Sequence, residues 1–141
     1  MALIRNVARA QEYAAEYCRI HPGSAFYWRV EDVLRSSGCF DVDGDYIPGP
    51  SRVELELLPF RVLKTTPSGV RIDDYQTRVN GKGRFISRDW TKQWACPTIE
   101  EAVQSFVARK KKQRLIYSSK LRNIDEALRL VELQTDSEVV F

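Results

Sequence analysis

The sequence has few of the residues that mark metal, disulfide or catalytic sites. It contains one histidine, His21, and three cysteines that lie far apart and form no Cys-x-x-Cys pair. This predicts reduced, mostly packed thiols and argues against a zinc site. Glycine-rich phosphate loops, Gly-x-Ser-x-Gly elbows and carboxylate pairs suited to acid–base chemistry are also missing. We therefore expect a protein that is not an enzyme and that uses neither a metal nor a cofactor.

Long apolar runs are missing as well, so the sequence predicts no membrane-spanning segment. Residues 1–17 lack the uninterrupted apolar core of a signal peptide, which favours an intracellular protein. A chain of 141 residues is most simply one domain with room for a modest core.

Charge is unevenly distributed along the chain. Lys and Arg number 6 against 9 Asp and Glu in residues 1–60, 15 against 5 in residues 61–122, and 1 against 5 in residues 123–141. A strongly basic middle section with acidic flanks indicates either an anionic partner or a solvated helix face balanced by acids elsewhere. Charge alone supports the two interpretations equally.

The first 50 residues predict a helical extension. An apolar stripe indicates a helix over residues 3–20, which the His21-Pro22-Gly23 segment ends, and a second short helix is expected over residues 26–36. Residues 40–51 are dense in Gly, Pro and Asp, which predicts a loop and a boundary near residue 50. Their Asp-x-Asp-x-Asp pattern resembles the start of a calcium loop, but Tyr46 and Arg52 stand where that loop needs glycine and glutamate.

The next section predicts a small antiparallel meander of about four strands. Residues 53–57 alternate apolar and acidic side chains, Pro59 interrupts, and residues 60–64 resume. A turn at residues 66–69 leads to a strand at 70–72. Asn80-Gly81 predicts a hairpin between residues 75–79 and 84–90, and a short strand at 93–96 precedes the final element.

The final element is predicted to be one long helix with a marked start. Thr98 is the expected N-cap, and Glu101 completes a capping box. Apolar residues then form a seam: Ile99, Val103, Phe106, Tyr117, Leu121, Ile124, Leu128 and Val131. Lys110 and Gln113 replace the two apolar residues missing from its middle. Since so long a helix is hard to cover within a small domain, we expect it to pair with its mate in a dimer or higher oligomer.

Aromatic and cationic residues interleave in the stretch before and within this helix. Trp94 or Phe85 is a candidate to stack on a base, and residues 109–114 are a candidate anion site. The competing interpretation is that the aromatic side chains face the core and the cations are solvated.

Three segments, LPFRVLKTTPSGVRI, RFISRD and KQWACPTIEEAVQSFVARKKKQ, resemble small phage proteins, in particular the first type of Thoeris anti-defence protein. The resemblance covers about residues 57 to 130. It implies a non-catalytic sponge in the host cytoplasm that sequesters the cyclic ADP-ribose isomer made by bacterial TIR proteins. It further implies ligand contacts at Trp94, Arg109 and Arg114, with Gln104 placed to hydrogen-bond a base or ribose.

The sequence thus predicts an α+β protein with N-terminal helices, a small antiparallel meander and a long C-terminal helix that pairs in an oligomer. Residues 1–50 form a helical extension, residues 51–133 the ligand-binding core, and residues 134–141 a frayed tail. The predicted function is sequestration of a small cyclic nucleotide without catalysis. The alternative is a nucleic-acid-binding or other anti-defence protein that uses the basic helix. The predicted ligand residues are Phe85, Trp94, Gln104, Arg109, Lys110, Gln113 and Arg114.

Overall fold

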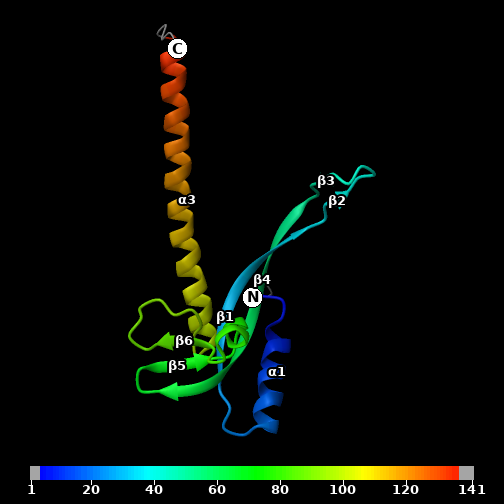
Figure 1. Ribbon diagram of the computed structural model, residues 1–141, viewed down its shortest axis with the longest axis vertical. Coiled ribbons are helices and arrows are strands. Elements are labelled where there is room, and N and C mark those ends of the chain that lie inside the picture. Colours follow the sequence, from blue (N-terminus) through cyan, green and yellow to red (C-terminus); the bar gives the residue numbers. More distant parts are fainter. Residues whose placement is uncertain (1–3, 137–141) are drawn as a thin grey trace. The chain divides into compact units, whose positions relative to one another are not determined.

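The computed structural model describes residues 4–136 and confirms the α+β class. The chain divides into two compact units, residues 1–106 and 107–141. The first unit contains α1 (Val7–Ile20), β1 (Phe26–Ser36), β2 (Cys39–Phe40), β3 (Tyr46–Ile47), β4 (Ser51–Thr66), β5 (Gly69–Ile72), α2 (Tyr75–Asn80) and β6 (Arg84–Ser87). Helix α3 (Ile99–Asp136) begins in the first unit and continues through the second (Figure 1).

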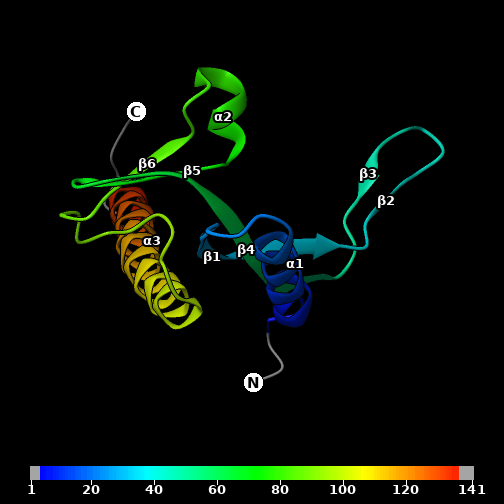
Figure 2. The same ribbon diagram turned by 90° about the horizontal axis from the view of Figure 1, so that it is seen from below.

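The first unit is built on an antiparallel sheet with strand order β1-β4-β5-β6. β1 pairs with β4 over its full length, from Phe26 opposite Arg61 to Ser36 opposite Ser51. The short strands β2 and β3 form a separate two-stranded sheet at the far end of this ribbon (Figure 2). The boundary predicted near residue 50 therefore lies in the connection between two strands that pair with each other.

Strand β4 runs straight through Pro59, where the sequence predicts an interruption. Pro59 lies opposite Trp28, whose backbone N–H and C=O instead bond to Cys96, at 2.7 and 2.8 Å. Trp28 and Pro59 are thus a non-hydrogen-bonded pair, and the N–H that proline lacks would point away from β1. The ladder loses no bond at this position.

The N-terminal segment closes part of the other edge of β4. Ile4 forms a parallel bridge to Leu55, and the Arg5 N–H donates to the Leu55 carbonyl. The Asn6 side chain then accepts from the Leu57 N–H and donates to the Leu57 carbonyl, both at 2.8 Å. One side-chain amide therefore takes the place of a neighbouring strand's backbone.

Two hydrophobic clusters stabilise the first unit. The first joins α1, β1, β4 and the start of α3 through the buried residues Ala10, Val30, Leu57, Cys96 and Ala102. The second joins β5, β6 and the segment before α3 through Val70, Ile72, Ile86 and Ala95. Because side chains alternate along β1 and β4, the two faces of this ribbon serve different clusters.

The helix predicted for residues 26–36 is wrong, because this segment is strand β1. Phe26 and Val30 are buried and Trp28 is partly buried, so the apolar side chains follow a period of two. Aromatic and β-branched residues favour a strand that can pair over its whole length, and β4 supplies that partner. Of the two predicted N-terminal helices, only α1 is present in the described residues.

The strand predicted for residues 75–79 is also wrong, because the segment forms helix α2. Asp74 and Thr77 form a reciprocal capping box at its start. Gly81 ends it in the left-handed conformation, with φ of 71°. The Asn-Gly pair is therefore a helix end and not a hairpin turn. The strand predicted for residues 93–96 is reduced to an isolated bridge between Cys96 and Trp28.

The long helix is confirmed, and it spans 38 residues. The Thr98 hydroxyl accepts a hydrogen bond from the Glu101 N–H at 3.2 Å, as the predicted N-cap requires. The helix includes residues 134–136 of the tail predicted to fray, whereas residues 137–141 lie outside the described part of the chain.

Candidate ligand-binding site

Trp94 lies among arginine and aromatic side chains in the first unit. The guanidinium carbons of Arg84 and Arg29 are 4.0 and 4.4 Å from its ring centroid, and the Phe60 ring is 5.0 Å away. Arg29 also donates to the Trp94 carbonyl at 2.6 Å. Cation–π contacts of this kind hold the indole in place. A base that stacked on the covered part of Trp94 would have to displace a guanidinium group.

The Arg84 side chain is fixed by a buried carboxylate. Its Nε donates to Asp74 at 2.7 Å, and only 1% of the Asp74 side chain is exposed. The same guanidinium also donates to the Tyr75 hydroxyl at 3.3 Å. Asp74 also caps α2, so its ion pair with Arg84 connects α2 to β6. Arg84 in turn contacts the Trp94 ring.

Phe85 occupies a different side of the sheet from Trp94. Its neighbour Ile86 is buried in the cluster that Trp94 packs against, so alternation along β6 turns Phe85 to the other face. There the Phe85 ring contacts Trp90 edge-on at 6.2 Å and lies 5.4 Å from the Arg71 guanidinium. The two aromatic residues that the sequence offered as base-stacking candidates therefore lie on opposite faces of the sheet.

The other predicted ligand residues all lie on α3. Gln104 is an exposed residue in the first turns of the helix. In the second unit, Arg114 and Gln113 are exposed, Arg109 and Lys110 are half-buried, and the Lys110 ammonium donates to Gln113 at 2.9 Å. The predicted site is therefore divided, with Phe85, Trp94 and Gln104 in one unit and the remaining four residues in the other.

The basic stretch of α3 is the strongest charge feature of the second unit. It contains seven cations without an intervening acid: Arg109, Lys110, Lys111, Lys112, Arg114, Lys120 and Arg122. Most of these side chains are exposed. At a rise of about 1.5 Å per residue they extend over roughly 20 Å of helix. A surface with this concentration of positive charge attracts anionic groups such as phosphate.

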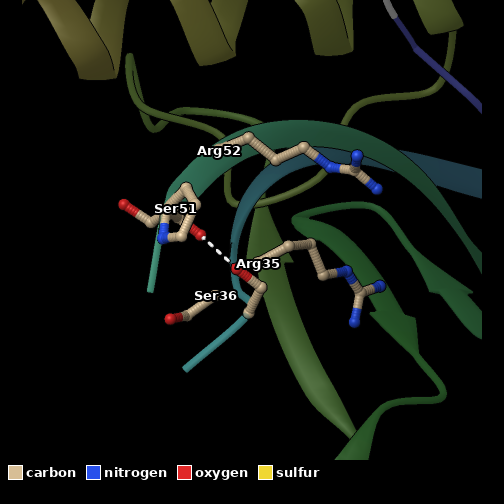
Figure 3. Close-up of a pocket in the computed structure, with 6 residues that line it drawn as sticks. Arg35, Ser36, Ser51 and Arg52 are labelled. Atoms are coloured by element: carbon tan, nitrogen blue, oxygen red, sulfur yellow. Dashed lines mark hydrogen bonds between the residues drawn. The ribbon is translucent and has the colours of Figure 1, made fainter. Parts of the chain in front are cut away.

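A cavity that the sequence did not predict lies in the outer half of the β1–β4 ribbon. It has a volume of about 380 Å³ and is lined by Arg35, Ser36, Ser37, Pro50, Ser51 and Arg52 (Figure 3). Figure 3 shows the Arg35 and Arg52 side chains pointing to the same side, as expected for residues that lie opposite each other in the two strands.

Glutamates balance the arginines near this cavity. Glu54 contacts Arg52 at 2.8 Å, Arg5 at 3.0 Å and Arg35 at 3.5 Å. Burial alone would raise the pKa of Glu54, but the positive charges of Arg5, Arg52 and Arg35 outweigh it and hold the pKa below its ordinary value of 4.5. Because Arg35 also pairs with Glu56 at 3.0 Å, the cluster is an internal ion network more than an open anion site. The predicted alternation of residues 53–57 indicated that Glu54 and Glu56 share a face, but not that Arg35 lies on the same face of the neighbouring strand.

Two further cavities lie in the first unit, and neither contains a predicted ligand residue. One, of about 490 Å³, is lined by Asp73, Asp74, Tyr75, Thr77 and Arg78. The other, of about 380 Å³, lies between α1 and β1 and is lined mainly by small and apolar residues. Among the described residues, no three His, Cys, Asp or Glu side chains are grouped so as to hold a metal ion.

No protein-family model, curated protein or solved structure matches the chain. Along residues 4–136, no helix combines the length and apolar character that crossing a membrane requires.

Proposed function

We propose that this protein binds and sequesters a small anionic nucleotide of the cyclic ADP-ribose type without converting it, as a phage-encoded inhibitor of bacterial immunity. The observation that carries the proposal is the basic stretch of α3, in which seven cations lie with no acid between them and in which Lys110 and Gln113 interrupt the apolar seam. Arg109 and Arg114 would hold phosphate oxygens through charge-assisted hydrogen bonds, and Gln104 would bind a base or ribose. Trp94 is the proposed stacking residue, although its Arg29 and Arg84 contacts also give it a structural role.

Oligomerisation through α3 belongs to the same proposal. Beyond the basic stretch, the seam residues Leu121, Ile124, Leu128 and Val131 are all more than half exposed. Their spacing of three and four residues fits a helix that packs against an identical helix. Sedimentation at increasing concentration should therefore show a dimer or larger species. A Leu121→Asp/Leu128→Asp variant should lose helix pairing and form smaller species than the parent at the same concentration. A parent chain that is monomeric at high micromolar concentration would rule the pairing out.

Release of intact ligand is the direct test of sequestration. The protein is incubated with the nucleotide produced by a bacterial TIR protein, separated from free nucleotide, and then denatured by heat. A binding protein should return the same nucleotide in stoichiometric amount. Recovery of a cleaved product would show that the protein is an enzyme.

Nucleic acid is the second candidate ligand, because the exposed cations continue along the helix to Lys120 and Arg122. Binding that neutralises several phosphates weakens steeply as salt increases. A site for one pyrophosphate should show a much shallower dependence. Calorimetry with the cyclic nucleotide and with a short DNA duplex, each at two salt concentrations, separates the candidates.

A further inference from the structure

The outer part of the β1–β4 ribbon, residues 34–53 including β2 and β3, forms an arm with uncovered apolar side chains. These exposed residues are Leu34, Phe40, Val42, Tyr46, Ile47 and Val53. The arm is nevertheless ordered internally, since the Phe40 and Tyr46 rings are 5.5 Å apart and the Tyr46 and Ser36 hydroxyls are 3.0 Å apart. A two-stranded ribbon is only marginally stable in water on its own, so this β-arm is a surface that needs cover.

The tip of the β-arm is acidic. Residues 37–50 contain Asp41, Asp43 and Asp45 and no Lys or Arg. Asp41 is used within the turn, because its carboxylate accepts the backbone N–H groups of Asp43 and Asp45 at 2.9 Å. The exposed Asp43 and Asp45 therefore give the apolar β-arm a negative end that would select a basic partner surface.

Helix α3 carries a basic surface on a side separate from its seam. At 100° per residue, Lys111, Leu115 and Arg122 fall within about 40° of one another, and about 80° or more from Tyr117 and Leu121 of the seam. All three are exposed, Leu115 by 71%. This basic face, which also includes the adjacent Lys112, combines cations with an uncovered leucine. It shares none of the predicted ligand residues.

We propose that the β-arm of one copy of the chain docks on the basic face of α3 in a second copy. Asp43 and Asp45 pair with the cations of that face, while the apolar residues of the β-arm cover Leu115. Both surfaces are present in every chain, so each copy has an arm to donate and a basic face to receive one. The seam remains available for helix pairing.

Disulfide trapping between two different chains tests this contact, since Cys39 is an exposed residue of the β-arm. The first chain keeps Cys39, and the second carries Cys39→Ser and Lys112→Cys. Mild oxidation of the mixture should give a mixed-chain disulfide at a yield about tenfold above that of a matched pair whose second chain carries Gln113→Cys instead, because docking raises the effective concentration of the thiols. A first chain with Cys39→Ser gives the background.

Charge reversal shows whether the proposed pairing directs the contact. Asp43→Lys/Asp45→Lys in the first chain, or Lys111→Glu/Arg122→Glu in the second, should each lower the disulfide yield by about tenfold, and combining the two should restore it. Circular dichroism checks that each exposed substitution leaves the fold intact. The proposal is overturned if the parent pair forms no disulfide above background, if single reversals leave the yield unchanged, or if the combined reversal does not restore it.

Discussion

The two units of the chain use apolar residues in opposite ways. In residues 4–106, strands and helices enclose Val30, Leu57 and Ile72 almost completely. In residues 107–136, a single helix carries a comparable set of apolar side chains, and no residue is fully buried. A helix cannot cover its own stripe, so residues 107–136 do not obtain the internal burial that stabilises the first unit. This exposed stripe is the surface through which we propose that the chain pairs with a second copy.

Truncating a buried leucine of the first unit should have the largest effect on the unfolding free energy. Leu57 is 0% exposed, so Leu57→Ala removes contacts and leaves a cavity that costs about 2–5 kcal/mol of unfolding free energy. Leu128→Ala in the second unit, measured at low protein concentration, should change it by about 0.5 kcal/mol or less. Urea denaturation provides both values. Equal losses of unfolding free energy would contradict the difference in burial between the two units.

Replacing Trp94 should show whether this residue stabilises the fold, binds the ligand, or does both. Because Trp94 contacts Phe60, Arg29 and Arg84, Trp94→Ala should lower the unfolding free energy by about 3 kcal/mol even without ligand. Trp94→Phe should retain more of this stability. A Trp94→Ala protein that unfolds like the parent but binds nucleotide about tenfold or more weakly would assign the residue to the ligand alone.

Replacing the arginines of the second unit should weaken nucleotide binding and leave the stability of the first unit unchanged. Each charge-assisted hydrogen bond to phosphate contributes about 1.5–3 kcal/mol, so Arg109→Ala and Arg114→Ala should each weaken nucleotide binding about ten- to a hundredfold. The unfolding free energy of the first unit should stay unchanged. Lys111→Ala, on another side of the same helix, is the matched control for calorimetry. An Arg109→Ala/Arg114→Ala variant with parental affinity would exclude this site.

Removing the Asn6 amide should have a smaller effect that is confined to the first unit. Asn6→Ala leaves the Leu57 N–H and carbonyl without their partner, which should cost about 1–3 kcal/mol of unfolding free energy. Asn6→Asp keeps an acceptor for the Leu57 N–H and should lose less. Denaturant titration of both variants checks the order, and an Asn6→Ala protein as stable as the parent would argue against this role.

Acid should produce the mildest effect, through Glu54. Its pKa is lower in the folded chain than its ordinary value of 4.5, so the folded state binds fewer protons than the unfolded state. This contribution to stability is present above pH 4.5 and is lost as the pH falls through the lowered pKa. The drop in unfolding free energy between pH 7 and pH 3 should therefore be smaller in Glu54→Gln than in the parent, with the exposed Glu132→Gln as control.

The parts of the fold that local chemistry determines were predictable from the sequence. Thr98 and Glu101 mark the start of α3, and the turn between β4 and β5 falls at the predicted Pro67-Ser68. Residues 26–36 were not predictable in this way, because their apolar pattern fits both a short helix and a strand. The choice depends on β4, which begins 15 residues after β1 ends. Likewise, the helical state of α2 depends on the reciprocal bonds of Asp74, against the hairpin preference of Asn-Gly.

The candidate site was predictable in composition but not in arrangement. The sequence identified the basic stretch of α3 and an aromatic residue before it. It did not indicate that Arg29, which lies 65 residues before Trp94, would contact the indole, or that Phe85 would face the other side of β6. These relations come from tertiary pairing, which spacing along the chain does not encode.

The outward edge of β4 has a consequence for solubility. An exposed strand edge with free N–H and C=O groups templates addition of a strand from another molecule. Here, four alternate positions are each blocked by a different means. Leu55 is bonded by Arg5, Leu57 by Asn6, Pro59 has no N–H to offer, and the Arg61 carbonyl accepts from Asp73. The edge of β4 between Leu55 and Arg61 is thereby kept from templating a further strand, which lowers the tendency of folded chains to aggregate edge to edge.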